Sequence, residues 1–67
     1  MRHERAKAII DKFAEKGVRK LELVFYSGYR RIAWHPAVIE DAVLFLTEDH
    51  RRSVILLTVI SDIKESK

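Results

Sequence analysis

The segment from Ser53 to Ile63 constrains the fold more than any other part of the chain. It is rich in β-branched residues and almost continuously apolar, which is typical of a strand. Alternate side chains of a strand point to opposite faces: Val54, Leu56 and Ile60 one way, and Ile55, Leu57, Val59 and Ile63 the other. A short chain cannot cover both faces, and an uncovered apolar edge strand pairs with other chains. We therefore expect a homo-oligomer.

Length and composition favour the same conclusion. The 67 residues form one domain, 1–67, near the lower size limit for a chain that folds alone. Such chains are commonly stabilised by disulfides, a metal or a partner subunit. The lack of cysteine excludes disulfides and thiolate zinc sites, and His3, His35 and His50 are too scattered for a helical metal pair. We expect no metal or cofactor, which leaves oligomerisation as the stabiliser.

Neither a signal peptide nor a membrane span is expected. The first residues, Met1 to Arg5, are mostly charged, and no apolar stretch of signal-peptide length follows them. The longest strongly apolar run, Val54 to Ile60, is far below the roughly 20 residues that span a bilayer. A soluble, cytoplasmic protein is the expectation.

The net charge of +3 is unevenly distributed. Residues 1–36 hold nine Lys or Arg against four Asp or Glu, a balance of +5, whereas residues 37–67 hold four against six, a balance of −2. The basic half predicts a positive surface that attracts polyanions. The alternative is a solvated helix face with no partner.

Residues 3–16 have the pattern of an amphipathic helix. Apolar residues recur at spacings of three and four and form one stripe: Ala6, Ile9, Ile10 and Phe13. Gly17 follows Lys16, at the position where a left-handed residue commonly ends a helix.

Residues 19–35 have the alternation of a β-hairpin. Ser27–Gly28 has the composition of a two-residue turn, since Gly28 accommodates the positive φ that such turns need. This turn would pair Tyr26 with Tyr29, Leu23 with Ile32, and Leu21 with Trp34. The core face would then carry Leu21, Leu23, Phe25, Ile32 and Trp34. The opposite face would carry Lys20, Tyr26, Tyr29, Arg31 and His35.

Residues 36–48 have two interpretations. Pro36 is expected to end the preceding strand, because proline cannot donate to a ladder. Beyond it, Ala42–Thr47 has the composition of a strand that is buried on both faces, but the apolar spacing also fits a helix at 36–48. We favour the strand, because the polar segment 48–52 then forms a hairpin loop into the next one. Residues 64–67 are expected to be a charged tail.

The predicted fold class is therefore mostly β, with one N-terminal α-helix and antiparallel strands within 18–63. An α+β fold with a second helix at 36–48 is the alternative.

Common catalytic motifs are missing from the sequence. The only glycines, Gly17 and Gly28, cannot form a nucleophile elbow, P-loop or dinucleotide fingerprint. The candidate binding residues are instead basic and aromatic: Lys20, Tyr26, Tyr29, Arg30 and Arg31, with Arg51 and Arg52 in a later loop. Tyrosines stack on bases and basic side chains neutralise phosphates, as in sites for single-stranded nucleic acid. A simple cross-strand pair is the alternative role of the two tyrosines.

The order of these elements resembles that of the Sm-like family, which includes the Hfq-like RNA chaperones. The segment Leu21–Gly28 is similar to the family's first strand and glycine turn, Ala42–Leu46 to its third strand, and Ile55–Ile63 to its closing motif. The resemblance spans residues 3–63. It implies a small, strongly bent five-stranded antiparallel sheet, or open barrel, and rings closed by edge-strand pairing between subunits. It also implies RNA contact at Gly28, Tyr29 and Arg30.

The chain departs from the family at the polar positions that bind uracil in the ring pore. Ala42 and Val43 stand at the Met and Asn positions of the third-strand signature. Leu56, Leu57 and Thr58 stand at the polar positions before the fifth strand. The resemblance therefore carries over only the RNA contact beside the hairpin turn.

Three functions are compatible with these features. The first is an Sm-like, ring-forming homo-oligomer that binds single-stranded RNA without catalysis. Its subunit interface would use apolar strand residues: Leu44, Leu46, Ile55, Leu57 and Val59. The second is a RelE-like ribonuclease toxin with a helix at 36–48, in which the phosphate would be met by Tyr29, Arg30, Arg31, His50 or Arg52. The third is a structural or partner-binding protein without a nucleic-acid role.

Overall fold

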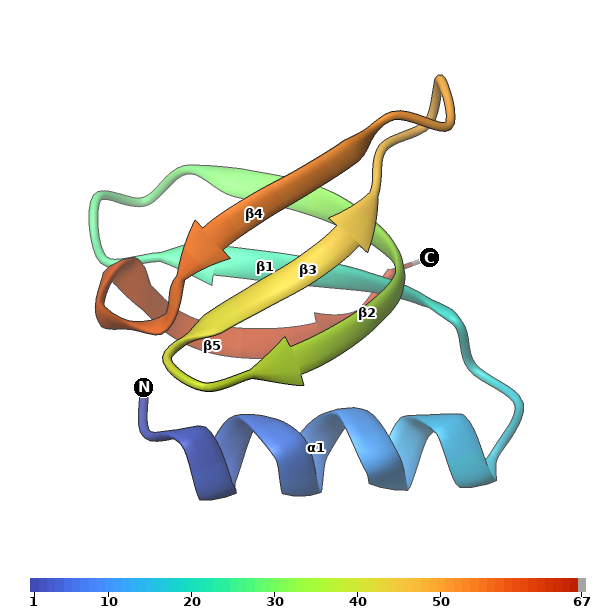
Figure 1. The fold of residues 1–67 in the computed structure, drawn as a ribbon, viewed down its shortest axis with the longest axis horizontal. Coiled ribbons are helices and arrows are strands. Elements are labelled where there is room, and N and C mark those ends of the chain that lie inside the picture. Colours follow the sequence, from blue (N-terminus) through green and yellow to red (C-terminus); the bar gives the residue numbers. More distant parts are fainter. Residues whose placement is uncertain (67) are drawn as a thin grey trace.

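One helix and five antiparallel strands make up the computed structural model, which describes residues 1–66 (Figure 1). The elements in chain order are α1 (His3–Glu15), β1 (Lys20–Phe25), β2 (Arg30–Ile39), β3 (Ala42–Leu46), β4 (Arg52–Leu56), a 3-10 turn (Leu57–Val59) and β5 (Ile60–Glu65). The strand order is β4-β3-β2-β1-β5, so β4 and β5 are the edges of a sheet that is not closed. The predicted fold class, mostly β with one N-terminal helix, is confirmed.

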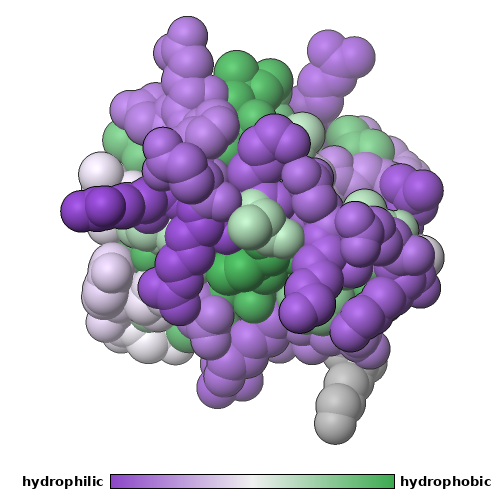
Figure 2. Space-filling view, turned by 90° about the horizontal axis from the view of Figure 1, so that it is seen from below, coloured by the Kyte–Doolittle hydropathy of each residue, from purple (hydrophilic) through white to green (hydrophobic). Residues whose placement is uncertain are grey.

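The helix α1 covers one side of the curved sheet and contacts β2 and β5 (Figure 1). It ends as predicted at Gly17, whose φ is 77°, and the Val18 amide donates to the Phe13 carbonyl oxygen at 2.9 Å. This pattern is a Schellman cap, which requires a left-handed residue. Ala6 and Ile10 are buried under the sheet, while Ile9 and Phe13 pack against the core from the side. Figure 2, which views the molecule from the side of α1, shows mainly hydrophilic side chains there.

The core lies between α1 and the inner face of the sheet. Its buried members come from the helix, from four of the strands and from the 3-10 turn: Ala6, Ile10, Leu21, Leu23, Ala33, Val43, Phe45, Leu57, Ile60 and Ile63. Burying such side chains is the main stabilising contribution available to a chain without disulfides. Each strand except β4 supplies at least one of them, so the core depends on the bend of the sheet.

The strand β2 bends in the middle and continues past Pro36, which corrects the predicted break. Its pairing with β1 covers Arg30–Trp34, and its pairing with β3 runs from Trp34 to Ile39 with a register shift between Trp34 and Ala37. His35 lies at this bulge with φ of 49°, a left-handed conformation. Because the bulge leaves one residue of β2 unpaired, Pro36, which has no amide hydrogen, does not have to donate at a regular position of the ladder.

The β1–β2 hairpin differs from prediction by one residue. Phe25 pairs with Tyr29 through an amide-to-carbonyl bond of 2.8 Å, which leaves a three-residue loop, 26–28. Gly28 has φ of 93° and closes this loop, as in hairpins built from a type I turn and a left-handed residue. The predicted register of Leu23 with Ile32 and Leu21 with Trp34 is therefore wrong.

The shifted register changes which side chains share a face. Leu21 now lies opposite Ala33, and Lys20 lies opposite Trp34. Trp34 and Ile32 are therefore on the outer face with Lys20, whereas the prediction placed both in the core. Ala33 takes the inner position and is completely buried.

The second half of the chain partly follows the prediction. Residues 42–46 form a strand, so the alternative of a second helix at 36–48 is wrong. The segment 53–63 is not one strand, because the chain turns at Leu57–Val59 between β4 and β5. Residues 64 and 65 belong to β5 and not to a tail, and residue 67 of the predicted tail lies outside the described residues. Within residues 1–66, no helix has the length and apolarity needed to cross a membrane.

The helix cap leads to a first prediction. Substituting Gly17→Ala should lower the free energy of unfolding by about 1–2 kcal/mol, because a Cβ disfavours the left-handed conformation. An added Cβ meets no atom within 4 Å, so the cost would be conformational and not steric. Urea denaturation measures the change. The control is Lys16→Ala, at a position with φ of −89°, which should leave stability nearly unchanged. Equal stabilities of the two variants would contradict the proposed cap.

Candidate nucleic-acid interface

Two tyrosines stand largely in water at the tip of the β1–β2 hairpin. Tyr26 is 72% exposed and Tyr29 is 75% exposed. The Tyr26 amide donates to the Val59 carbonyl oxygen at 3.1 Å, which fixes the loop beside the 3-10 turn. A shallow hollow of about 460 Å³ lies between this loop and the 3-10 turn, and its lining includes Phe25, Tyr26, Ser27 and Thr58. Apolar rings and hydroxyl groups therefore meet on one small surface.

The two arginines after the hairpin point to opposite faces of β2. Arg30 lies opposite Val24, and its Nη1 is 3.1 Å from Oε1 of Glu22 on the outer face. Arg31 lies opposite Leu23, and its guanidinium carbon is 6.0 Å from the centre of the Phe45 ring, a cation–π distance. The prediction that Arg31 shares a face with Lys20 is therefore wrong. Both arginines nevertheless begin β2 directly after Tyr29.

Lys20 does not belong to this cluster. It begins β1, and the hairpin loop follows the other end of that strand, about 17 Å away at the usual rise per residue. Its ammonium lies 5.4 Å from the centre of the Trp34 ring. The five predicted binding residues thus divide between the hairpin tip, with Tyr26, Tyr29, Arg30 and Arg31, and the opposite end of β1.

The positive surplus of the first half does not come from the helix. Residues 3–15 hold three Lys or Arg and three Asp or Glu, a balance of zero. Within 1–36, six basic residues lie outside the helix against the single acidic Glu22, which gives the whole balance of +5. The alternative of a solvated helix face therefore accounts for none of the surplus. The six basic residues are Arg2, Lys16 and Arg19 outside the strands, Lys20 at the start of β1, and Arg30 and Arg31 at the start of β2.

The β4 edge of the sheet leaves backbone groups free for pairing. In the β3–β4 ladder, Thr47 donates to Arg51 and Leu57 donates to Asp41, so the odd-numbered residues of β4 face β3. The amides and carbonyls of Arg52, Val54 and Leu56 consequently point away from the sheet. Val54 and Leu56 also carry exposed apolar side chains. This edge has the properties that favour addition of another strand.

The other edge is protected by one side chain. Ser66 donates to Lys20, so the even-numbered residues of β5 face β1 and the Ile63 amide points outward. Oδ1 of Asp62 accepts a 2.8 Å hydrogen bond from that amide. A side chain thus occupies a position that a neighbouring strand would use.

The predicted interface residues have different environments. Val59 is exposed, Ile55 is half-buried against the core, and Leu57 is only 2% exposed within it. Leu44 and Leu46 are half-buried on the outer face, in an apolar hollow of about 390 Å³ that also includes Val54. A charge at Leu57 would therefore disrupt the monomer before any assembly.

The residues that were expected to act together on a phosphate in a ribonuclease lie far apart in the structure. Figure 1 places the hairpin loop with Tyr29 and the β3–β4 loop with His50 at opposite ends of the molecule. Among residues 1–66, no group of three His, Asp or Glu side chains lies close enough to hold a metal ion.

The comparisons with known proteins find nothing that matches this chain, whether among family models, curated proteins or solved structures. Its function must therefore be inferred from its own residues.

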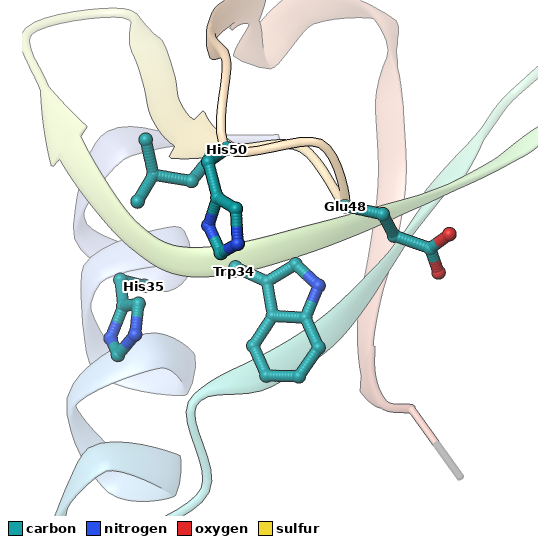
Figure 3. A pocket seen from close by; sticks show the side chains of 5 residues that line it. Trp34, His35, Glu48 and His50 are labelled. Carbon is teal, nitrogen blue, oxygen red and sulfur yellow. The ribbon is translucent and has the colours of Figure 1, made fainter.

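One feature of the outer face was missed by the sequence reasoning. Trp34 lines a hollow of about 480 Å³ with His35, Leu46, Glu48 and His50 (Figure 3). The apolar alternation assigned Trp34 to the core, and no spacing rule connects residues 34–35 with 46–50. The three-residue β1–β2 loop sets the register that turns Trp34 to the outer face. The bulge at His35 then sets the pairing of β2 with β3, which leads into residues 46–50.

Proposed function

We propose that this protein is an Sm-like homo-oligomer that binds single-stranded RNA without catalysing a reaction. The observation that carries the proposal is the exposure of Tyr26 and Tyr29 at a hairpin tip that leads directly into Arg30 and Arg31. A base stacked on either ring removes apolar surface from water, and every base has a face that can stack. The site would therefore tolerate many sequences.

The arginines supply the complementary charge. Arg30 and Arg31 leave β2 on opposite faces, so phosphates on either side of the hairpin have a cation within reach. In the free protein, the negative charge of Glu22 offsets part of the positive charge of Arg30. Arg31 instead lies beside the uncharged ring of Phe45. Guanidinium groups pair with phosphate through two parallel hydrogen bonds. We therefore assign binding of the RNA phosphates to these arginines and base stacking to the tyrosines.

The edges of the sheet support assembly. An edge with exposed Val54 and Leu56 would promote aggregation of a single subunit, and pairing with another subunit would bury these side chains. The two edges are unlike: β4 carries Arg52, whereas β5 carries Asp62 and Glu65 with Lys64. Pairing of unlike edges is head-to-tail, and such contacts close into rings or continue as filaments. We propose a ring, in which each subunit contributes one hairpin surface.

The architecture also favours this family over the ribonuclease toxin. An N-terminal helix followed by a bent, five-stranded antiparallel sheet is what the Sm-like resemblance implies. The toxin hypothesis needs a helix at 36–48, where the chain forms strands. The replaced uracil-binding signatures remain a departure from the family, and the hairpin surface does not depend on them.

The RNA proposal is tested at the hairpin. Tyr29→Ala should weaken binding of a single-stranded RNA oligonucleotide about 5- to 150-fold, the usual cost of losing one base–aromatic stack. Arg30→Gln should lower the slope of log affinity against log salt by about one, because one phosphate contact is lost. Fluorescence anisotropy at several salt concentrations measures both.

The matched control is Lys12→Ala on the charge-balanced helix, which should leave affinity and salt slope unchanged. If Tyr29→Ala and Lys12→Ala bind RNA equally well at the same salt concentration, the hairpin is not the interface.

The assembly proposal is tested with Val54→Pro. The Val54 amide points out of the sheet, so proline removes a donor to a neighbouring subunit without breaking the β3–β4 ladder. Light scattering should give the mass of a monomer, and circular dichroism should show an unchanged fold. Val54→Thr keeps the amide and the β-branched shape, and it should assemble normally. A folded proline variant with the native mass would exclude β4 as the interface, and a native protein that stays monomeric at high concentration would overturn the oligomer.

A further inference from the structure

A second hollow lies at the other end of the molecule from the hairpin loop. It measures about 480 Å³, within the range of small-molecule sites, and its lining combines one indole, two imidazoles, one carboxylate and Leu46. In Figure 3 the imidazole of His50 hangs from the β3–β4 loop toward β2 beside Trp34, while Glu48 and His35 lie on opposite sides of the indole. The hollow is therefore bounded by aromatic rings and flanked by hydrogen-bonding groups.

Trp34 is placed unusually for the only tryptophan of a small β protein. It lies on the outer face opposite Leu46, half-buried, and not in the core. The Lys20 ammonium is 5.4 Å from its ring centre, close enough for a cation–π interaction. A planar ligand stacked on this indole would thus find a positive charge beside it, as an anionic nucleotide requires.

Backbone strain is concentrated at the same place. Three non-glycine residues among those described have positive φ, and two of them, His35 (49°) and His50 (62°), line this hollow. Left-handed conformations are unfavourable for residues that carry a Cβ. Strain of this kind persists where the surrounding structure holds it, and it is found preferentially at binding sites.

The β3–β4 loop is held in one shape by its own hydrogen bonds. The His50 amide donates to the Thr47 carbonyl oxygen at 3.0 Å, and the Arg51 amide donates to Thr47 Oγ1 at 3.1 Å. Arg51 also pairs with Asp49, at 3.3 Å between Nε and Oδ2. These contacts engage Thr47, Asp49 and Arg51 with one another, whereas Glu48 and His50, between them, line the hollow. The imidazole of His50 is turned toward β2, and the carboxylate of Glu48 lies at the outer rim (Figure 3). Such preorganisation reduces the entropy lost on binding.

The lining selects among bases by its chemistry. An indole stacks on any base, but a carboxylate accepts hydrogen bonds and cannot donate them. Glu48 therefore favours bases with an exocyclic amino group, which adenine, cytosine and guanine have. The ring donor of uracil, N3–H, lies between two carbonyl oxygens that repel a carboxylate, so uracil is the poorer partner. The imidazoles can donate to base nitrogens, carbonyl oxygens or phosphate.

We propose that the hollow between Trp34, Glu48 and the two histidines binds an amino-bearing nucleobase of the RNA strand and discriminates against uracil. The proposal rests on the proposed RNA-binding function and adds to it a second, base-selective contact. The hairpin tyrosines would bind RNA bases of any type, and this hollow would give the protein its preference for amino-bearing bases.

The test uses the fluorescence of Trp34, excited at a wavelength where nucleotides absorb little. Adenosine, guanosine and cytidine monophosphates should quench it, with affinities at least about fivefold higher than that of uridine monophosphate. Glu48→Ala should reduce this ratio toward one. Glu15→Ala, an exposed carboxylate on α1, should preserve it.

The outcomes separate the two proposals. Tyr29→Ala should weaken oligonucleotide binding but leave quenching by mononucleotides intact. RNA binding without quenching by any mononucleotide, or equal quenching by all four, would overturn the base-selective hollow and leave the hairpin function standing. Quenching by amino-bearing mononucleotides with no affinity for RNA would instead make the ligand a free nucleotide and overturn the RNA function.

Discussion

The bend in β2 at His35 is the feature on which the other elements depend. One residue in a left-handed conformation lets a single strand pair with β1 over its first half and with β3 over its second. Figure 1 shows β2 curling round one side of the molecule, which turns a flat ribbon into a concave surface. That concavity allows one short helix to meet inward side chains from β1, β2, β3 and β5. A straight β2 would leave the apolar stripe of α1 without an enclosing core.

Elements with local signals could be predicted from the sequence. The helix follows from the spacing of Ala6, Ile10 and Phe13 and from Gly17, and the third strand follows from its composition. The turn at Leu57–Val59 could not be predicted, because it contains no glycine, proline or asparagine and two of its residues, Thr58 and Val59, favour strands. The hairpin register failed by one residue, because Gly28 serves a two-residue and a three-residue loop equally well. A shift of one residue exchanges the two faces of a strand.

The candidate site was predictable to the same extent. Residue types predicted a binding surface at Tyr26, Tyr29 and Arg30, and the exposure of these residues at the hairpin tip is compatible with that prediction. The face assigned to Arg31 and the core assignment of Trp34 both depended on register, and both failed with it. The hollow around Trp34 depends on a bulge and a loop that are far apart in sequence, so no local pattern contains it. The composition and periodicity of single elements can thus be recognised from one sequence more readily than contacts between residues that are far apart along the chain.

The contact between Asp62 and the Ile63 amide has a consequence for the oligomer proposed above. The β4 edge is open as folded, whereas the β5 edge offers this amide only after the carboxylate rotates away. Asp62 thus competes with any neighbouring strand for one outward-facing donor of the β5 edge. In the proposed oligomer, the Asp62 carboxylate would have to find another hydrogen-bond donor, in the partner or in water, before a neighbouring strand could accept from the Ile63 amide.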